Sequence, residues 1–366
     1  MRIIFFIGTV DLLLSTIGYL YYRQQLPFGR SLWFSIGYLV LTINAICSRA
    51  LSPNLPHALV KLSAWAEGLW VAFGYYTLLF AILHFLLWLC SKALPIHIPS
   101  AKLALITLVA SCLTVTFGSL NAFRPVIRTE HIVTSKLPAG TSYKLALISD
   151  VHLGRILGRS YAEKLTQRLN DLQPDAVLIA GDLVDERIAY VEEEDSLAAL
   201  KALKAPKGVY LAFGNHEYID NPARWEQLVE AHGIRVLRDA STVIDGQLKI
   251  TGLNDFRYSK GKGPKALQSL AWENEKYYSI LMDHQPRRML GAARAGYDLY
   301  LSGHTHTGQL FPNRQITKRM YLLDYGRQEF GRLTAITSSG YGFWGPPVRT
   351  ETAPEIVLIE VRGAAQ

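Results

Sequence analysis

The order of apolar and polar residues divides the chain into two unlike parts. Toward the N-terminus, apolar residues form four long runs with few charges, at residues 3–22, 31–48, 68–90 and 102–120. Each run can cross a hydrocarbon layer about 30 Å thick, which takes about 20 helical residues. Tyr and Trp cluster near the ends of the runs, as they do at membrane interfaces. The pattern predicts a four-helix transmembrane region within residues 1–120.

The first apolar run also fits a cleaved signal peptide. Three further runs follow it, however, and no small-residue cleavage pattern appears after it. We therefore interpret residues 3–22 as a membrane helix. Asp11 and His84 lie inside apolar runs, where an ionisable group is either functional or paired with a neighbouring helix.

The Lys and Arg residues indicate how the predicted helices are oriented. Five of them lie on the side that the N-terminus shares with the C-terminal part, against four on the other side. Because positive charge favours the cytoplasmic side, we expect a multi-pass inner-membrane protein whose C-terminal part is cytoplasmic.

Most of the charge lies after residue 120. The formal net charge of +8 divides into +5 before residue 121 and +3 after it. The C-terminal part is therefore only mildly basic, which argues against a stable nucleic-acid partner. All three cysteines lie in the apolar part, so the remainder has no thiolate for a disulfide or a zinc site.

Short apolar runs alternate with helical patterns in the C-terminal part. Residues 121–142 predict a linker and a first strand that lead into a domain at 143–366. Strands are predicted at 143–149, 176–180 and 208–213, and helices near 160–172, 192–204 and 222–232. This alternation favours an α/β fold. Shorter runs predict a second, more mixed sheet, with strands near 234–237, 248–253, 278–282, 299–302 and 356–361.

Five short polar motifs each follow one of the predicted strands. In open α/β sheets, ligand sites form beyond the carboxyl ends of the strands. The motifs can therefore meet at one rim, although they span more than 150 positions. They are Asp150-Val151-His152, Gly181-Asp182, Gly214-Asn215-His216-Glu217, Asp283-His284 and Gly303-His304-Thr305-His306.

The side chains of these motifs suit divalent metal ions. Their oxygen and nitrogen donors, without sulfur, favour Mn²⁺, or a mixed Fe/Mn or Zn pair, over a structural zinc site. Two such ions about 3.5–4 Å apart can share a carboxylate, activate water and neutralise a phosphoryl group. A single motif is weak evidence, because a capping Asn or a surface His has the same appearance. The motifs together predict phosphoester hydrolysis.

The motifs resemble those of the calcineurin-like metallophosphoesterase superfamily over residues 140–362. The resemblance implies a four-layer fold in which two packed mixed β-sheets are flanked by helices. It also implies two metal ions, bridged by Asp182, and hydrolysis by a hydroxide between them. One ion would be held by Asp150, His152, Asp182 and His306, and the other by Asp182, Asn215, His284 and His304.

The resemblance further implies acid–base roles for two residues. His216 would face the leaving group as an acid or an electrostatic clamp. Asp185 resembles the acid that orients this histidine in protein phosphatases, whose motif reads Gly-Asp-x-Val-Asp-Arg. This chain has Glu186 at the position of that phosphate-binding Arg, with Arg187 one place later. The difference argues against a protein phosphatase.

The apolar part changes the expected substrate. The sequence resembles membrane-associated bacterial members of the family, one subgroup of which cleaves the pyrophosphate of UDP-2,3-diacylglucosamine in lipid A synthesis. We therefore expect a lipid-linked phosphodiester or pyrophosphate. The alternatives are a soluble phosphodiester or nucleotide and a non-catalytic metal-binding scaffold. Predicted substrate contacts, which could equally be solvated surface side chains, are Arg155, Arg187, Lys260, Lys262 and Arg319.

Overall fold

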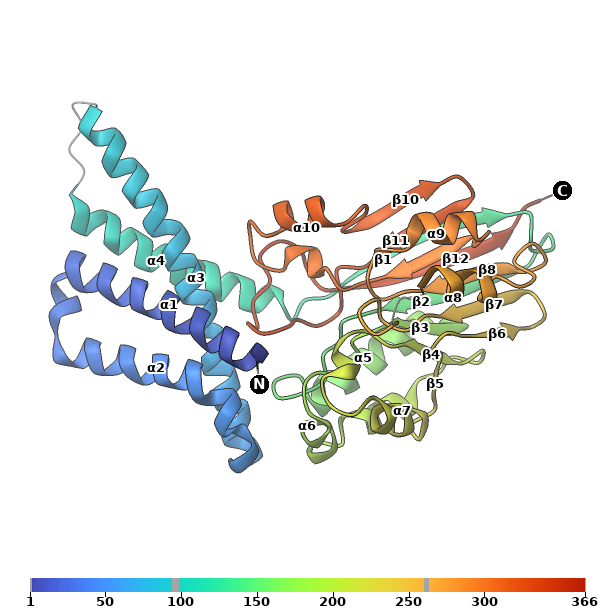
Figure 1. Cartoon of the computed structure of the whole chain (residues 1–366), viewed down its shortest axis with the longest axis horizontal. Coiled ribbons are helices and arrows are strands. Elements are labelled where there is room, and N and C mark those ends of the chain that lie inside the picture. The colour runs from blue at the N-terminus through green and yellow to red at the C-terminus, as the bar shows by residue number, and fades with distance from the viewer. Residues whose placement is uncertain (1, 94–98, 260–262, 366) are drawn as a thin grey trace. The chain divides into compact units, whose positions relative to one another are not determined.

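The computed structural model describes residues 2–93, 99–259 and 263–365, which belong to two units (Figure 1). Unit 1 comprises the chain up to Ala122 together with Gly345–Thr350. Unit 2 comprises Phe123–Trp344 and the residues from Glu351 onward. The chain therefore passes between the units three times.

Unit 1 is built from four long helices. They are α1 (Arg2–Gln25), α2 (Leu32–Leu51), α3 (His57–Ala93) and α4 (Ser100–Asn121). Among the described residues, three helices are long and apolar enough to cross a membrane, at Leu32–Asn54, His57–Lys92 and Ser100–Asn121. The first predicted span, α1, is not among them. The predicted run 3–22 begins with residues whose side chains lie outside the described part of the structure, so this fourth span stays a prediction.

Polar side chains inside unit 1 contact neighbouring helices. His84 Nδ1 of α3 lies 2.7 Å from the hydroxyl of Tyr21 on α1. Arg49 Nε of α2 lies 2.8 Å from Glu67 Oε1 of α3, and Asp11 is buried in the same unit. His84 and Arg49 thus each contact a second helix within unit 1.

A segment far along the chain completes unit 1. Arg349 donates its backbone N–H to the carbonyl of Gly118 at 2.9 Å, and the side chain of Asn121 donates to the carbonyl of Arg349 at 3.0 Å. A Cβ at Gly118 would collide with the side chain of Val348. The segment Gly345–Thr350 therefore packs closely on α4.

The first sheet of unit 2 has the strand order β1-β12-β2-β3-β4-β5. β12 is parallel to β1 and antiparallel to β2, and the strands from β2 to β5 are parallel. The bounds are β1 (Val126–Thr134), β2 (Ser142–Ile148), β3 (Ala176–Ala180), β4 (Val209–Ala212), β5 (Ile234–Val236) and β12 (Glu355–Gly363).

The second sheet has the order β10-β11-β9-β8-β7-β6. Its four central strands are parallel, and both edge strands are antiparallel to their neighbours. Both sheets are mixed, as the resemblance implies, but the prediction that residues 234–237 and 356–361 form strands of the second sheet is wrong, because β5 and β12 pair with strands of the first sheet. The bounds are β6 (Ala240–Ile244), β7 (Leu248–Gly252), β8 (Tyr278–Met282), β9 (Leu299–Ser302), β10 (Gly326–Phe330) and β11 (Leu333–Thr337).

The main core of unit 2 lies between the two sheets. Side chains from β2 and β3, such as Leu147 and Leu178, form one buried cluster with Ile250, Ile280 and Leu301 of the second sheet. Because side chains alternate between the two faces of a strand, this cluster marks the inner face of each sheet. Two sheets packed in this way give the rigid frame whose strand ends carry the polar motifs.

Helices of unit 2 connect these strands (Figure 1). One predicted helix, 192–204, is divided in the structure because Asp195 between its two parts adopts a left-handed backbone with φ 48°. The helices α8, α9 and α10 were not predicted. The bounds are α5 (Arg159–Leu172), α6 (Ile188–Glu193), a 3-10 helix (Ser196–Ala202), α7 (Pro222–Glu230), α8 (Gly263–Leu270), α9 (Met289–Arg294) and α10 (Arg314–Met320).

The core between the sheets can be tested with one buried and one exposed leucine. Leu178→Ala is expected to lower the free energy of unfolding by about 2–5 kcal/mol, because Leu178 is fully buried. Leu290 is 53% exposed on α9, so Leu290→Ala should have a small effect. Thermal unfolding of the purified full chain measures both. Equal shifts in Tm would contradict the position of the core.

Candidate metal centre

The predicted ligands follow strands of both sheets. Asp150 comes after β2, Asp182 after β3 and Asn215 after β4, all in the first sheet. His284 comes after β8 and His304 after β9 in the second sheet. Because these strands run parallel within each sheet, their carboxyl ends lie at one edge, where ligand sites form.

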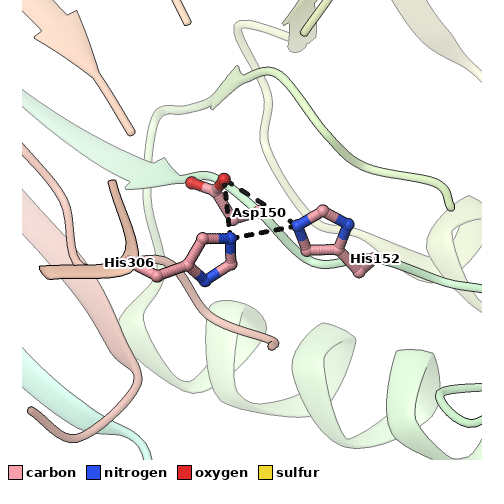
Figure 2. Close-up of side chains that lie close together, drawn as sticks. All are labelled: Asp150, His152 and His306. Carbon is pink, nitrogen blue, oxygen red and sulfur yellow. Dashed lines mark hydrogen bonds and ion pairs between the residues drawn. The ribbon is translucent and has the colours of Figure 1, made fainter. Parts of the chain in front are cut away.

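Asp150, His152 and His306 form the first group of donors (Figure 2). The Nε2 atoms of the two histidines lie 3.2 Å apart. Asp150 Oδ1 is 3.3 Å from His306 Nε2 and 3.9 Å from His152 Nε2. Three donor atoms this close, from segments more than 150 residues apart, point toward one common position.

Asp182, His284 and His304 form the second group. His284 Nε2 lies 3.1 Å from Asp182 Oδ2 and 3.2 Å from His304 Nδ1. The other nitrogen of His284, Nδ1, donates to the carbonyl of Ala180 at 2.8 Å, which directs Nε2 into the group. Asp182 Oδ2 is also 3.9 Å from His152 Nε2, so this carboxylate reaches both groups.

Most of the donor atoms have the states that metal binding requires. Asn215 Oδ1 is buried and has no hydrogen-bond donor in the described part of the chain. Burial lowers the pKa of both His152 and His304 to about 3, so both rings are neutral at neutral pH. Burial raises the pKa of Asp150, but the neighbouring His306 and His284 outweigh it and lower that pKa, so the carboxyl is ionised. Burial lowers the pKa of His284, but Asp182 outweighs it and raises that pKa well above its ordinary value, so a bound ion would displace a proton from this ring. The orphaned oxygen, the imidazoles and the carboxylates together fit divalent ions.

Five of the predicted ligands have a left-handed backbone. Their φ angles are 52° for Asp150, 54° for His152, 53° for Asp182, 70° for His304 and 46° for His306. A residue other than glycine in this region costs about 1–3 kcal/mol, and such residues concentrate at functional sites. The surrounding fold must therefore hold each of these turns in place.

Glu217, for which no role was predicted, holds two of the ligand loops together. Its buried carboxylate accepts the backbone N–H groups of Asp182 at 3.1 Å, Leu183 at 2.7 Å, Val184 at 3.3 Å and Gly214 at 2.7 Å. The loops after β3 and β4 are thus joined beside the predicted bridging ligand. The signal available in the sequence was the position of Glu217 directly after His216, the predicted acid–base residue.

His216 lies beside both donor groups, and its Nδ1 is 2.6 Å from Asp185 Oδ1. Together with His152 and Asp182 it could form a third donor group. Burial lowers the pKa of His216, but the charges of Asp182 and Asp185 outweigh it and raise the pKa to about 9. This arrangement instead suits a proton donor whose ring is oriented by Asp185.

The residues predicted to contact the substrate lie in different environments. Arg155 is buried, and its Nε lies 2.7 Å from Glu186 Oε2. Arg187 precedes α6 and is exposed, and Arg319 is exposed on α10. Lys260 and Lys262 lie outside the described residues. Their contacts with a substrate therefore stay predictions.

Residues 143–308 match the family described as Calcineurin-like phosphoesterase. An uncharacterized metallophosphoesterase of Aquifex aeolicus is 34% identical over 242 residues, which cover 63% of this chain and 90% of that protein. A transmembrane protein with metallophosphoesterase domain from Danio rerio is 29% identical over 343 residues, which cover 87% of this chain and 77% of that protein.

Other similar proteins match a smaller share of their own length. An uncharacterized metallophosphoesterase of Campylobacter jejuni is 32% identical over 224 residues, or 60% of this chain and 59% of that protein. The chain thus spans about three fifths of that relative's length. Among solved structures, Haemophilus influenzae NAD nucleotidase aligns with a TM-score of 0.38 and 18% identity over 55% of this chain and 46% of that chain. This score supports no functional comparison.

Gly303→Ala is expected to weaken metal binding about 10- to 100-fold. A Cβ at Gly303 would collide with the carboxylate of Asp150 and the side chain of Ser149. Gly37→Ala is the control, because a Cβ at Gly37 would meet no atom within 4 Å. The metal content of the purified full chain, measured by mass spectrometry after incubation with limiting Mn²⁺, compares the two. Equal metal content would contradict the predicted role of Asp150.

Proposed function

This chain belongs to the calcineurin-like phosphoesterase family, and we propose on that premise that it hydrolyses a phosphodiester or pyrophosphate bond with two divalent metal ions. One observation carries the proposal. Two groups of donor residues meet within reach of the Asp182 carboxylate. The first group is Asp150, His152 and His306, and the second is Asp182, His284 and His304.

The chain offers a complete donor set for two ions. The first would be held by Asp150, His152, Asp182 and His306, and the second by Asp182, Asn215, His284 and His304. Two divalent ions in these positions would lower the pKa of water and neutralise charge on a phosphoryl group. The mixed oxygen and nitrogen donors favour Mn²⁺.

His216 supplies a proton to the leaving oxygen in this proposal. Its ring is an imidazolium at neutral pH, with Asp185 on Nδ1. Nε2 lies 3.9 Å from Asp182 Oδ2 and therefore faces the donor groups. Asp185 fixes the orientation of the ring and stabilises its charge, so that Nε2 carries the proton that the leaving group needs.

The proposed substrate is a phosphoester linked to a lipid, such as UDP-2,3-diacylglucosamine. Three helices can cross a membrane by length and composition, and relatives from Danio rerio and Bos taurus are named transmembrane proteins. An enzyme attached to a bilayer meets amphiphilic substrates at high local concentration. We further propose that the chain lies in an inner membrane with unit 2 on the cytoplasmic side.

The proposal is tested by assaying the full chain in lipid nanodiscs with Mn²⁺. Cleavage of both UDP-2,3-diacylglucosamine and bis(p-nitrophenyl) phosphate supports a lipid-linked substrate. Cleavage of the aryl diester alone favours a soluble phosphodiester. Failure to cleave either substrate, with two ions bound per chain, would favour the non-catalytic scaffold.

His216→Ala is expected to lower kcat about 10²- to 10⁴-fold while the metal content stays unchanged, because the side chain donates a proton and is not a ligand. His232→Ala is the matched control, since His232 contacts the carbonyl of Leu228 at the end of α7. Rates on the aryl diester and metal analysis measure both quantities. Loss of bound metal in His216→Ala would show that His216 is a ligand instead.

Asp185→Asn is expected to move the alkaline limb of the kcat–pH profile to lower pH. The charges of Asp182 and Asp185 raise the pKa of His216 above 6.5, so the acid form persists until the pH passes that raised value. Removing one charge lowers the pKa, and the proton donor is lost earlier as the pH rises. An unchanged limb would show that His216 is not the group that titrates.

A further inference from the structure

Large apolar side chains are exposed in one short segment that contains α10. Phe311 is 58% exposed, Ile316 56%, Met320 55% and Leu322 55%. Ile316 and Met320 are four residues apart on α10 and therefore lie on the same face of that helix. Exposed apolar surfaces of this kind mark sites for ligands, membranes or proteins. We call these four residues the apolar lip.

Two exposed cations belong to the helix that carries part of the apolar lip. Lys318 and Arg319 are exposed on α10, and no carboxylate of the described residues lies within 4 Å of either. Arg314 at the start of the same helix is different, because its Nε lies 3.4 Å from Asp324 Oδ2. Arg319 comes three residues after Ile316 and therefore flanks the apolar face, whereas Lys318 lies on the other side of α10. An apolar face beside an unpaired cation is complementary to an anionic amphiphile.

The apolar lip is joined to the loop that carries two predicted ligands. The ring of Tyr321, between Met320 and Leu322, packs on the ring of His304 with 6.0 Å between centroids. Thr305 donates its hydroxyl hydrogen to the carbonyl of Asp324 at 2.6 Å. The hydroxyl of Thr317 on α10 donates to the Asp324 carboxylate at 3.0 Å. Tyr321 thus connects the apolar lip to His304 of the second donor group.

We propose that the apolar lip binds the hydrocarbon part of an amphiphilic phosphoester whose phosphate lies at the metal centre. This inference rests on the proposed function and names the part of the chain that would recognise a lipid-linked substrate. Arg319 attracts the anionic headgroup region. An amphiphile is favoured over a peptide because the exposed surface combines hydrocarbon with a cation, and because this chain carries helices that can cross a bilayer.

The test compares two substrates with the same scissile bond. Dodecyl p-nitrophenyl phosphate and methyl p-nitrophenyl phosphate differ only in hydrocarbon, and both are assayed with the full chain in nanodiscs. The double variant Ile316→Ser, Met320→Ser should lower the ratio of kcat/KM for the dodecyl over the methyl ester by about tenfold. The control Val133→Ser changes an exposed apolar residue of β1, 70% exposed, and should leave the ratio unchanged. An unchanged ratio in the double variant would overturn the proposal.

If the wild-type chain cleaves neither ester, the proposed function is contradicted. A binding measurement then still tests whether the apolar lip binds hydrocarbon. The native cysteines Cys47, Cys90 and Cys112 are first replaced by Ser. An environment-sensitive fluorophore is then attached to the cysteine introduced by Met320→Cys. Dodecyl phosphate should shift its emission to shorter wavelength in a saturable way, and methyl phosphate should not. The same label at Val133→Cys should not respond. No shift at position 320, or a change of oligomeric state in the double serine variant, would overturn the proposal.

Discussion

The carboxylate of Asp182 is the group on which the rest of the site depends. One oxygen accepts the backbone N–H of His216 at 2.9 Å, and the other lies 3.1 Å from His284 and 3.9 Å from His152. It therefore touches groups from both sheets. Its own loop is held by Glu217, which accepts N–H groups from the strand ends on either side. A shift of this one carboxylate would disturb both donor groups and the orientation of the proton donor together.

Burial and charge have opposite effects on the histidines around Asp182. Burial dominates at His152 and His304, whose pKa values fall to about 3, and leaves both rings neutral. At His216 the charges of Asp182 and Asp185 dominate, and the pKa rises to about 9. Asp185, whose Oδ1 lies 2.6 Å from Nδ1 of His216, contributes to this increase. One buried site thus provides both neutral donors and a charged acid.

The donor residues could be predicted because each motif follows an apolar run, and such runs end at one edge of a sheet. The left-handed turn at Asp150 and the four contacts of Glu217 could not be predicted, because they depend on segments far apart in sequence. α10 has only seven residues, too few for helical periodicity to show. The membrane span predicted from the first apolar run stays a prediction, because the side chains at its start lie outside the described residues.

The second passage of the chain into unit 1 sets the order in which that unit is made. Translation completes α1 to α4 before Gly345–Thr350 leaves the ribosome, and about 220 residues of unit 2 are synthesised between them. At about 5–20 residues per second, this takes roughly 10–45 s. During that time Gly118 and Asn121 lack their contacts with Val348 and Arg349. The helical unit therefore reaches its final packing only after Gly345–Thr350 has been synthesised, and no single cut in the chain yields two complete units.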